Sequence, residues 1–317
     1  MKGLKRIAVL GTPDSWYFRD LQRAAGNDFE IHSFSFSSIS AHVGASVSAT
    51  NQDGDHQSLD QFDATIVRTM PPGSTEEIVF RMDALGAHYR NGGVVINSPR
   101  SLEAAIDKYL SLQRLAEAEI PIPRTIACQT VEQAMNAFHD LGRRTVVKPL
   151  FGGEGRGITF VDDEDIALRV FKTLSQMNLV IYLQEFIPHE GFDLRILVIG
   201  DQTFCIKREN KNDWRTNISR GATAARVSPP KSTIELAVRA AKTLGVDVAG
   251  VDILTAPSEQ PVVIEVNAVP GWMGLAKTLE IDIARSVLEY CDQVTRTAYT
   301  PSSSDDEYQP QHPSVTE

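Results

Sequence analysis

The first hundred residues alternate short apolar runs with stretches of helical periodicity, and this alternation constrains the fold more than any other feature of the sequence. Neighbouring parallel strands need a crossover connection, which is usually a helix, so the alternation predicts a parallel α/β sheet. The polar stretch at 37–60 predicts a loop or an irregular edge. The predicted strands lie at 7–10, 29–36, 63–68 and 93–97, and the predicted helices at 15–25 and 75–89.

The remainder of the chain continues with both element types. One helix is predicted at 101–118, because the segment is opened by Ser98 and Pro99 and is stopped near Pro121. The last residues, 299–317, lack the apolar content needed to fold and predict a disordered tail. Further strands are predicted at 145–148, 158–161, 179–184, 194–199, 203–207, 248–254 and 261–266, and further helices at 164–177, 233–244 and 276–290.

Charge and cysteine content exclude several classes of protein. The chain has 31 Lys and Arg against 41 Asp and Glu, a net charge of −10, which argues against a general nucleic-acid binder. Its apolar runs are far shorter than the roughly 20 residues that span a bilayer, and residues 1–10 read as a strand rather than a signal peptide. The three cysteines, Cys128, Cys205 and Cys291, form no disulfide framework or metal-binding spacing, so a cytoplasmic location is expected.

A lysine followed by a glycine-rich segment is the sharpest local motif. Lys148 ends a predicted strand, and Gly152, Gly153, Gly155 and Gly157 follow it. Glycine backbone can approach a polyphosphate closely and direct several N–H groups at it, and lysine adds a positive charge. The alternative is a plain hairpin loop. The motif matches neither the P-loop nor the dinucleotide-binding fingerprint.

Acidic and amide side chains interrupt two apolar strands near the C-terminal end. Glu265 and Asn267 are two residues apart and share one strand face, while Ile264 and Val266 are expected to point into the core. If the two strands pair as a hairpin, Asp252 can lie opposite them. Such an oxygen cluster suits Mg²⁺, and the alternative is an ordinary half-exposed sheet face.

A cluster of basic residues stands out in this acidic chain. Arg195 lies on one predicted strand and Lys207 and Arg208 end the next, before a polar segment with Arg215, Asn217 and Arg220. The cluster is either a solvated loop or a clamp for phosphate and carboxylate oxygens. Lys108, inside the predicted 101–118 helix, would by itself be an ordinary solvated lysine. No zinc-site spacing and no Gly-x-Ser-x-Gly motif is present, so zinc sites and hydrolase triads have no support.

In order along the chain, these motifs resemble the ATP-grasp superfamily, and more narrowly the RimK-type carboxylate–amine ligases, over residues 98–292. The resemblance implies an α/β fold, α+β in its C-terminal part, in which a pre-ATP-grasp domain with a parallel sheet precedes the ATP-grasp fold. The implied domains are 1–98 (pre-ATP-grasp), 99–185 (central subdomain with the Gly-rich loop) and 186–298 (C-terminal subdomain with the metal site). The motifs that carry it are Asp107-Lys108, Val147-Lys148-Pro149, Gln184-Glu185-Phe186-Ile187, Gly191-Phe192-Asp193-Leu194-Arg195, Arg215-Thr216-Asn217, 247–252 and 265–271.

The resemblance also implies a role for each matching residue. Lys108 and Lys148 would contact ATP phosphates, under the loop that contains Gly152, Gly153, Gly155 and Gly157. Asp252, Glu265 and Asn267 would bind Mg²⁺ (or Mn²⁺), usually two ions. The remaining roles are an adenine-binding hinge at Glu185, Phe186 and Ile187, a ribose contact at Asp193, nucleotide and substrate contacts at Arg215, Thr216 and Asn217, and a catalytic set of Arg195, Lys207, Arg208 and Arg220.

The implied reaction is ATP-dependent amide-bond formation through an acyl phosphate. L-glutamate would be added to the terminal carboxylate of an acceptor, either a ribosomal-protein C-terminus or a pterin coenzyme of the tetrahydromethanopterin type. A ligase acting on an amino-group-carrier protein in lysine or arginine biosynthesis, and a non-catalytic ATP-binding regulator, are the alternatives. Val269 stands where the family commonly has Ser, which leaves the acceptor open. The resemblance implies a homo-oligomer, while the acidic charge and the short apolar runs predict no nucleic-acid or membrane partner.

Overall fold

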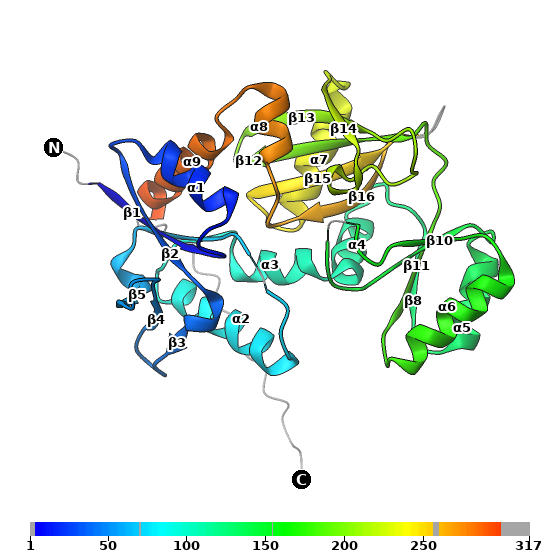
Figure 1. The fold of residues 1–317 in the computed structure, drawn as a ribbon, viewed down its shortest axis with the longest axis horizontal. Coiled ribbons are helices and arrows are strands. Elements are labelled where there is room, and N and C mark those ends of the chain that lie inside the picture. The colour runs from blue at the N-terminus through cyan, green and yellow to red at the C-terminus, as the bar shows by residue number, and fades with distance from the viewer. Residues whose placement is uncertain (1–3, 70, 154, 256–259, 299–317) are drawn as a thin grey trace, which may run out of the picture.

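The computed structural model describes residues 4–69, 71–153, 155–255 and 260–298. Its N-terminal part is a parallel sheet of order β2-β1-β6-β7, as the alternation of strands and helices predicts. Figure 1 shows this sheet at the left of the molecule. The elements are β1 (Lys5–Leu10), α1 (Trp16–Ala25), β2 (Phe29–Phe34), β6 (Ala64–Val67), α2 (Thr75–Arg90) and β7 (Val95–Ile96).

The stretch 37–60, expected to be a loop or irregular edge, instead contains a small antiparallel sheet of order β3-β4-β5. The expectation was wrong because few side chains in these strands are apolar, although Val47 and Ala49 are buried in the core together with Leu59. The strands are β3 (Ser40–Ala41), β4 (Val47–Thr50) and β5 (His56–Ser58), flanked by the 3₁₀ turns η1 (Phe36–Ser38) and η2 (Leu59–Gln61).

The single helix expected at 101–118 is two helices, α3 (Pro99–Ile106) and α4 (Lys108–Glu117). Asp107 has an extended backbone, and its carboxylate accepts hydrogen bonds from the N–H groups of Tyr109 (2.9 Å) and Leu110 (3.1 Å). Asp side chains compete for backbone N–H groups in this way and so begin a helix rather than continue one. The break makes Lys108 the first residue of α4.

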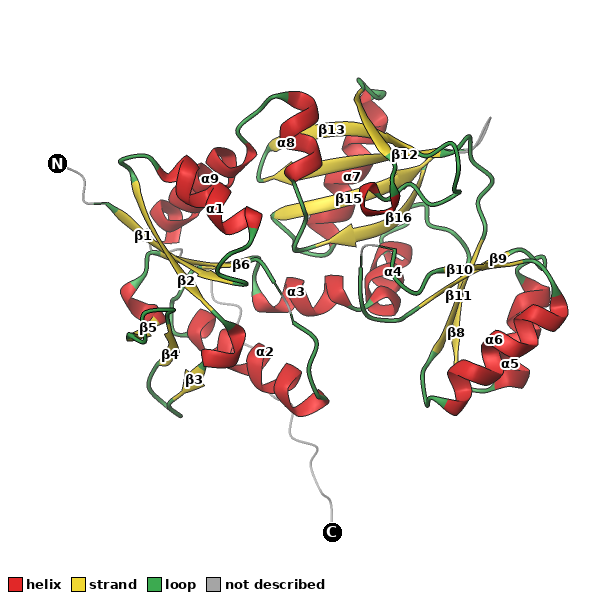
Figure 2. Ribbon diagram, viewed as in Figure 1, coloured by secondary structure: helices red, strands yellow, loops and turns green. Residues whose placement is uncertain are grey.

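A second four-stranded sheet, called the second sheet below, has the order β10-β9-β11-β8. It is antiparallel and covered by two helices. Figure 2 shows this sheet and its two helices at the right. Their separate core contains Phe138 and Phe171. No element is predicted at 124–144, although Thr130 and Gln133 form a capping box there, a helix-start signal. The elements are β8 (Thr125–Cys128), α5 (Val131–Asp140), β9 (Thr145–Lys148), β10 (Thr159–Val161), α6 (Glu164–Gln176) and β11 (Ile181–Glu185).

The third large sheet has the order β14-β13-β12-β15-β16 and is antiparallel throughout. Side chains alternate along β12, so Ile196 and Val198 enter one core while Leu197 and Ile199 enter another. The elements are β12 (Phe192–Ile199), β13 (Gln202–Glu209), η3 (Ile218–Arg220), β14 (Thr223–Arg226), α7 (Lys231–Thr243), β15 (Val248–Leu254), β16 (Val262–Asn267), α8 (Met273–Leu279) and α9 (Ile283–Ala298).

The C-terminal end differs from expectation in one respect. The helix expected at 276–290 is two, because α8 ends at Leu279 and the next residue, Glu280, has a left-handed backbone (φ 56°). Within the described ranges no helix has both the length and the apolar character needed to cross a membrane. The segment expected to be a disordered tail, 299–317, lies outside the described residues.

Candidate functional site: a cleft between two sheets

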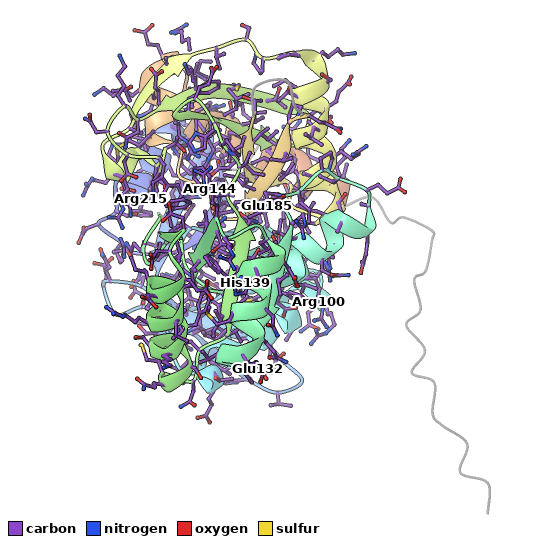
Figure 3. The ribbon with its side chains drawn as sticks, turned by 90° about the vertical axis from the view of Figure 1, so that its right-hand side faces the viewer. Arg100, Glu132, His139, Arg144, Glu185 and Arg215 are labelled. Carbon is purple, nitrogen blue, oxygen red and sulfur yellow. The ribbon has the colours of Figure 1, made fainter. Side chains whose placement is uncertain are left out.

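A cleft containing about 820 Å³ of empty space, part of it open to solvent, lies between the second sheet and the five-stranded sheet. Figure 3 looks onto the end of the molecule formed by α5 and α6, where Arg144, Glu185 and Arg215 lie at the end of these helices nearest the five-stranded sheet. Most of the predicted site residues line this cleft: Lys108, Lys148, Gly152, Gly153, Gly155, Glu185, Phe186, Ile187, Asp193, Arg208, Arg215, Thr216, Asn217, Asp252 and Glu265.

Two lysines form one wall of the cleft. The Lys148 ammonium donates to Oε1 of Gln184 (2.5 Å), and the Lys108 ammonium donates to the Gly152 carbonyl (2.5 Å). Burial lowers the pKa of Lys148 to about 8, and it also lowers the pKa of Lys108. The hydrogen-bond acceptors of both ammonium groups are thus neutral oxygens. The negative charge of Glu265 raises both lysine pKa values and so partly opposes the effect of burial.

The glycine-rich segment reaches across to the five-stranded sheet. Gly155 has a left-handed backbone (φ 69°), and a Cβ added there would lie 2.6 Å from Oδ1 of Asn217. Nη2 of Arg220 donates to the Gly155 carbonyl (3.1 Å). These contacts require glycine at 155. Gly157 packs on the ring of Pro149 and is not among the described lining residues.

Aromatic side chains form the end of the cleft beside the predicted hinge. The rings of Phe160 and Phe186 are 4.7 Å apart, and the ring of Trp214 is 5.9 Å from that of Phe186. The hinge residue Glu185 accepts a hydrogen bond from the backbone N–H of Arg124 (2.7 Å). Trp214 lines the cleft but was not predicted, because a lone tryptophan in a polar loop carries no motif.

A buried network of two carboxylates and two guanidinium groups lies under the other wall. Arg208 contacts Asp193 (2.5 Å) and Asp252 (2.9 Å), and Arg195 forms a bidentate pair with Asp252. The Thr216 hydroxyl donates to Asp193 (2.6 Å). Asp193 and Asp252 are only 1% and 2% exposed. Buried carboxylates need such partners, and here two acids neutralise two arginines.

The electrostatics of this network follow from burial and pairing. Burial would raise the pKa of Asp252, but the positive charges of Arg195 and Arg208 outweigh it and hold that pKa below its ordinary value. Burial raises the pKa of Asp193, although Arg208 and Thr216 oppose the shift. Burial would also lower the pKa of Arg208, but the two carboxylates outweigh it and raise that pKa.

The predicted carboxylate pair forms as expected. β15 and β16 pair as antiparallel neighbours with Asp252 opposite Glu265, and Asn267 lies opposite Gly250. The expectation that Ile264 points into the core was wrong: a β-bulge in the register skips this residue, which is half-buried and lines the cleft. Bulges beside functional sites often redirect a side chain in this way.

The donor set at this edge fits Mg²⁺. Two carboxylates from neighbouring strands and a nearby amide oxygen provide hard oxygen ligands, and Mg²⁺ in proteins often has one or two carboxylate ligands beside water and phosphate oxygens. Among the residues described, no group of three or more His, Cys, Asp or Glu side chains could hold a metal ion by itself. The arrangement therefore suits an ion that is bound partly by these side chains and partly by phosphate oxygens. It does not form a site in which the described side chains alone surround the ion.

Five predicted residues are not among the described residues that line the cleft: Gly157, Arg195, Lys207, Arg220 and Asn267. The Lys207 ammonium lies 4.2 Å from the centre of the Phe192 ring and 3.3 Å from Glu209. Among the described residues, Arg195 is joined to the cleft lining through Asp252, and Arg220 through the Gly155 carbonyl. The roles of these residues therefore stay predictions.

A protein-family profile described as the RimK-like ATP-grasp domain matches residues 105–291. The chain belongs to the RimK-like ATP-grasp family. It is 30% identical to the tetrahydromethanopterin:α-L-glutamate ligase of Methanosarcina acetivorans, over 92% of this chain and all of the relative. It is 31% identical to the ribosomal protein bS6–L-glutamate ligase of Escherichia coli, over 93% of this chain and 98% of the relative.

Solved structures agree with this ATP-grasp assignment. A RimK domain protein from Sphaerobacter thermophilus has a TM-score of 0.70 at 22% identity, over 90% of this chain and 98% of that protein. The ATP-grasp ligase PsnB, solved with a variant precursor, Mg and ADP, has a TM-score of 0.68 at 22% identity, over 92% of this chain and all of that chain. The expected ATP-grasp fold and membership among the ATP-grasp ligases that form C–N bonds are thereby confirmed.

Proposed function

We propose that this ATP-grasp ligase joins the amino group of L-glutamate to the terminal carboxylate of an acceptor, using ATP and Mg²⁺. One observation carries the proposal: Lys108 and Lys148 line the same cleft as the cross-strand pair of Asp252 and Glu265. A triphosphate needs cations along its oxygens and a divalent ion beside its terminal phosphates. The cleft offers a cationic wall and a metal-binding wall for such a group.

The chain provides matching contacts for each part of ATP. Lys108, Lys148 and the glycine-rich segment would bind the phosphates, because exposed backbone N–H groups and ammonium groups both suit anionic oxygens. Phe186 and Trp214 would flank the adenine, since their rings already lie at the apolar end of the cleft. Asp193, which resemblance assigns to the ribose, is already bonded to Arg208 and Thr216. A ribose contact there would have to share its carboxylate with these partners.

Asp252, Glu265 and Asn267 would hold the Mg²⁺ ions. Bound Mg²⁺ would neutralise triphosphate charge that otherwise repels an approaching carboxylate. Arg195 and Arg208 fix the orientation of the Asp252 carboxylate, and Asp252 stays ionised because its pKa is held low. The protein thus keeps one ligand charged and positioned before any ion binds.

The proposed reaction has two steps. The acceptor carboxylate attacks the γ-phosphorus of ATP and releases ADP, which gives an acyl phosphate. The glutamate amine then attacks the acyl carbon, loses its proton and displaces phosphate. The chain's part is to position the reactants, neutralise charge and exclude water from the acyl phosphate. A covalent enzyme intermediate is not needed, and buried Cys205, whose pKa burial raises to about 12, is unsuited to form one.

The acceptor is proposed from the relatives. Both matched ligases are aligned over almost their whole length at nearly equal identity, one named for a pterin coenzyme and the other for a ribosomal protein. A carboxylate at the end of a pterin side chain and a protein C-terminal carboxylate undergo the same chemistry. We therefore propose a terminal carboxylate of one of these two kinds as the acceptor.

The test is phosphate release from ATP in the presence of labelled glutamate and, in separate arms, tetrahydromethanopterin, ribosomal protein bS6 or an amino-group-carrier protein. Mass spectrometry would then locate the label. Release that requires both glutamate and one of the first two acceptors supports the proposal. Nucleotide binding without acceptor-dependent release would instead indicate a regulator. The matched control is Lys172→Met, which changes an exposed lysine on α6 that is not among the described residues lining the cleft.

A further inference from the structure

A buried contact joins the N-terminal parallel sheet to the segment that directly follows β16, residues 268–272, here called the β16–α8 loop. Asn97, at the end of β7, is 1% exposed. Its side-chain amide donates to the carbonyls of Val248 (2.9 Å) and Ala268 (2.6 Å). Its side-chain oxygen accepts from the N–H groups of Asp247 (2.9 Å) and Val248 (2.8 Å). The whole hydrogen-bonding capacity of this side chain is directed at the five-stranded sheet and its loop.

Arg68, at the end of β6, makes a second buried contact with the same loop. Its Nη2 donates to the Pro270 carbonyl (2.9 Å), and its guanidinium carbon lies 4.1 Å from the Trp272 ring centre and 4.7 Å from that of Tyr17. The residue is 8% exposed, and its buried Nε has no hydrogen-bond partner. In the described part of the chain, no carboxylate pairs with it. Burying a guanidinium without a carboxylate partner lowers the stability of the folded protein, so we infer that Arg68 has a role other than stabilising the fold.

Tyr17 and Asp20 of α1 also contact this loop. A Cβ added to Gly271 would lie 2.5 Å from the Tyr17 hydroxyl oxygen, so a larger residue at 271 would require the loop or Tyr17 to shift. The indole N–H of Trp272 donates to Asp20 (2.9 Å). Residues from the carboxyl ends of two N-terminal strands, β6 and β7, and from the helix after β1 therefore contact a loop of five residues.

The β16–α8 loop packs directly against groups of the proposed metal site. A Cβ added to Gly250 would lie 2.9 Å from Cβ of Pro270 and 3.0 Å from Nη1 of Arg195. Gly250 lies opposite Asn267 and accepts a hydrogen bond from its amide (3.5 Å). Pro270, Arg195 and Asn267 thus all lie against Gly250, where a side chain would not fit. We therefore expect a shift of Pro270 to displace Arg195 or Asn267. Close packing transmits such displacements.

We propose that Arg68, Tyr17 and Asn97 are positioning residues of the ligase, which hold the β16–α8 loop where Asn267 and Arg195 can serve a metal-bound nucleotide. The inference rests on the proposed function and assigns the N-terminal sheet a part in the metal site. None of the three residues touches a reacting group. Each acts on the site through the loop.

The sharpest test uses Gly271→Ala, which forces Tyr17 and the loop apart without removing any charge. Calorimetric titration of ADP at a series of Mg²⁺ concentrations reports the Mg²⁺ needed for half-maximal binding. Supporting groups around a metal site commonly change metal affinity by about 10–100-fold, so Gly271→Ala should raise that concentration by about tenfold or more. The double variant Tyr17→Phe/Gly271→Ala, which removes the clashing oxygen, should restore the wild-type requirement. Tyr17→Phe alone measures the effect of the hydroxyl itself.

A second variant, Arg68→Met, should raise the Mg²⁺ requirement in the same direction. Its matched control is Arg285→Met, which removes a different contact between N- and C-terminal parts, the 2.7 Å ion pair with Asp28, and leaves the β16–α8 loop untouched. Arg285→Met should keep the wild-type Mg²⁺ requirement even if its melting temperature falls. A purely structural role for Arg68 would lower the melting temperature without changing the Mg²⁺ titration.

The outcomes separate the two claims. An unchanged Mg²⁺ requirement in both Gly271→Ala and Arg68→Met would overturn the positioning role while leaving the proposed function in place. Failure of the Tyr17→Phe substitution to rescue Gly271→Ala would also overturn it. Absence of Mg²⁺-dependent ADP binding in the wild-type chain would overturn the proposed function and this inference together.

Discussion

Lys148 and Arg208 are both cations that line the cleft, but their surroundings differ. Arg208 contacts two carboxylates, Asp193 and Asp252. Burial alone would lower its pKa, but the two negative charges outweigh burial and raise that pKa. Lys148 is hydrogen-bonded to the neutral side chain of Gln184, and burial lowers its pKa to about 8. The five-stranded sheet therefore neutralises its buried arginine within the protein, whereas the second sheet leaves its lysine without an ion pair among the described residues.

The two walls of the cleft therefore differ before any ligand binds. The wall formed by the five-stranded sheet, here called the paired wall, is rigid because each of its charged groups already has its partners. The wall that contains Lys108 and Lys148, here called the lysine wall, has ammonium groups without an ion pair among the described residues. An anionic ligand would therefore offset the free-energy cost of burying these charges. Substitutions on the two walls should therefore have opposite effects on the stability of the ligand-free protein.

The largest expected effect is on the paired wall. Asp193→Ala leaves the Arg208 guanidinium buried with one carboxylate fewer, and breaking such a pair costs about 3–5 kcal/mol of folding free energy. Urea unfolding of the ligand-free protein measures it. Asp213→Ala is the matched control, since Asp213 pairs with the more exposed Arg215 and its loss should change the free energy of unfolding little. Equal losses in both variants would contradict the contrast between the walls.

Next in size is the loss of turnover in Lys148→Met. Removing one fixed cation from a site of developing negative charge lowers turnover by about 10²–10³-fold. Phosphate release in the presence of glutamate and acceptor measures this loss, with Lys172→Met as the control that should match wild type. Wild-type turnover in Lys148→Met would rule out the proposed phosphate contact.

Glu265→Gln tests the metal-binding wall itself. The substitution keeps the shape of the side chain and removes its charge, so the Mg²⁺ concentration for half-maximal turnover should rise by about 10–100-fold. A Mg²⁺ titration of phosphate release measures the shift. The control is Glu235→Gln on the exposed face of α7, where Glu235 pairs with Lys231. An unchanged titration in Glu265→Gln would count against the metal site.

A smaller effect of opposite sign is expected on stability in Lys148→Met. The pKa of Lys148 falls from an ordinary value near 10.5 to about 8 in the folded protein. The unfolded chain thus binds more protons between these values, so burial of the charge costs stability below pH 8, and the cost disappears as pH rises toward 10.5. Lys148→Met should raise the free energy of unfolding by about 1–3 kcal/mol at pH 7. A destabilised variant would show that the Lys148 ammonium is better satisfied than its contacts indicate.

The smallest expected effect is the pH dependence of nucleotide binding. With a pKa of about 8, Lys148 is mostly charged at pH 7 and mostly neutral at pH 9, so ADP affinity should fall by about tenfold between them. Calorimetry at both pH values measures the change. Lys148→Arg, which stays charged throughout, should flatten the profile. An equally steep profile in that variant would assign the pH dependence to another group.

Parts of this site could be predicted from the sequence because their signals are local. The pairing of Asp252 with Glu265 follows from two neighbouring apolar strands, each interrupted by a polar residue, and the structure has that register. Lys148 and the glycines could be found because the strand, the lysine and the loop are contiguous. The break at Asp107 was missed, because periodicity continues across it and only the capping hydrogen bonds of its carboxylate reveal it.

Other parts depend on contacts between distant segments. The bulge at Ile264 arises from the register between β15 and β16, which the alternation of apolar residues does not encode. The bidentate pair of Arg195 with Asp252 joins two neighbouring strands, and the basic cluster from which a catalytic role for Arg195 was predicted does not reveal this partner. Arg68 carries no motif, since a lone arginine after a strand becomes distinctive only when Trp272, about 200 residues later, packs against it.

The decisive measurement is a crystal structure of the chain with Mg²⁺ and a non-hydrolysable ATP analogue. Nζ of Lys108 and of Lys148 should then lie about 3 Å from phosphate oxygens. A carboxylate oxygen of Asp252 or Glu265 should lie about 2.1 Å from a Mg²⁺ ion that also binds the phosphates. A nucleotide bound outside the cleft, or phosphates in contact with neither lysine, would contradict the proposed ATP site.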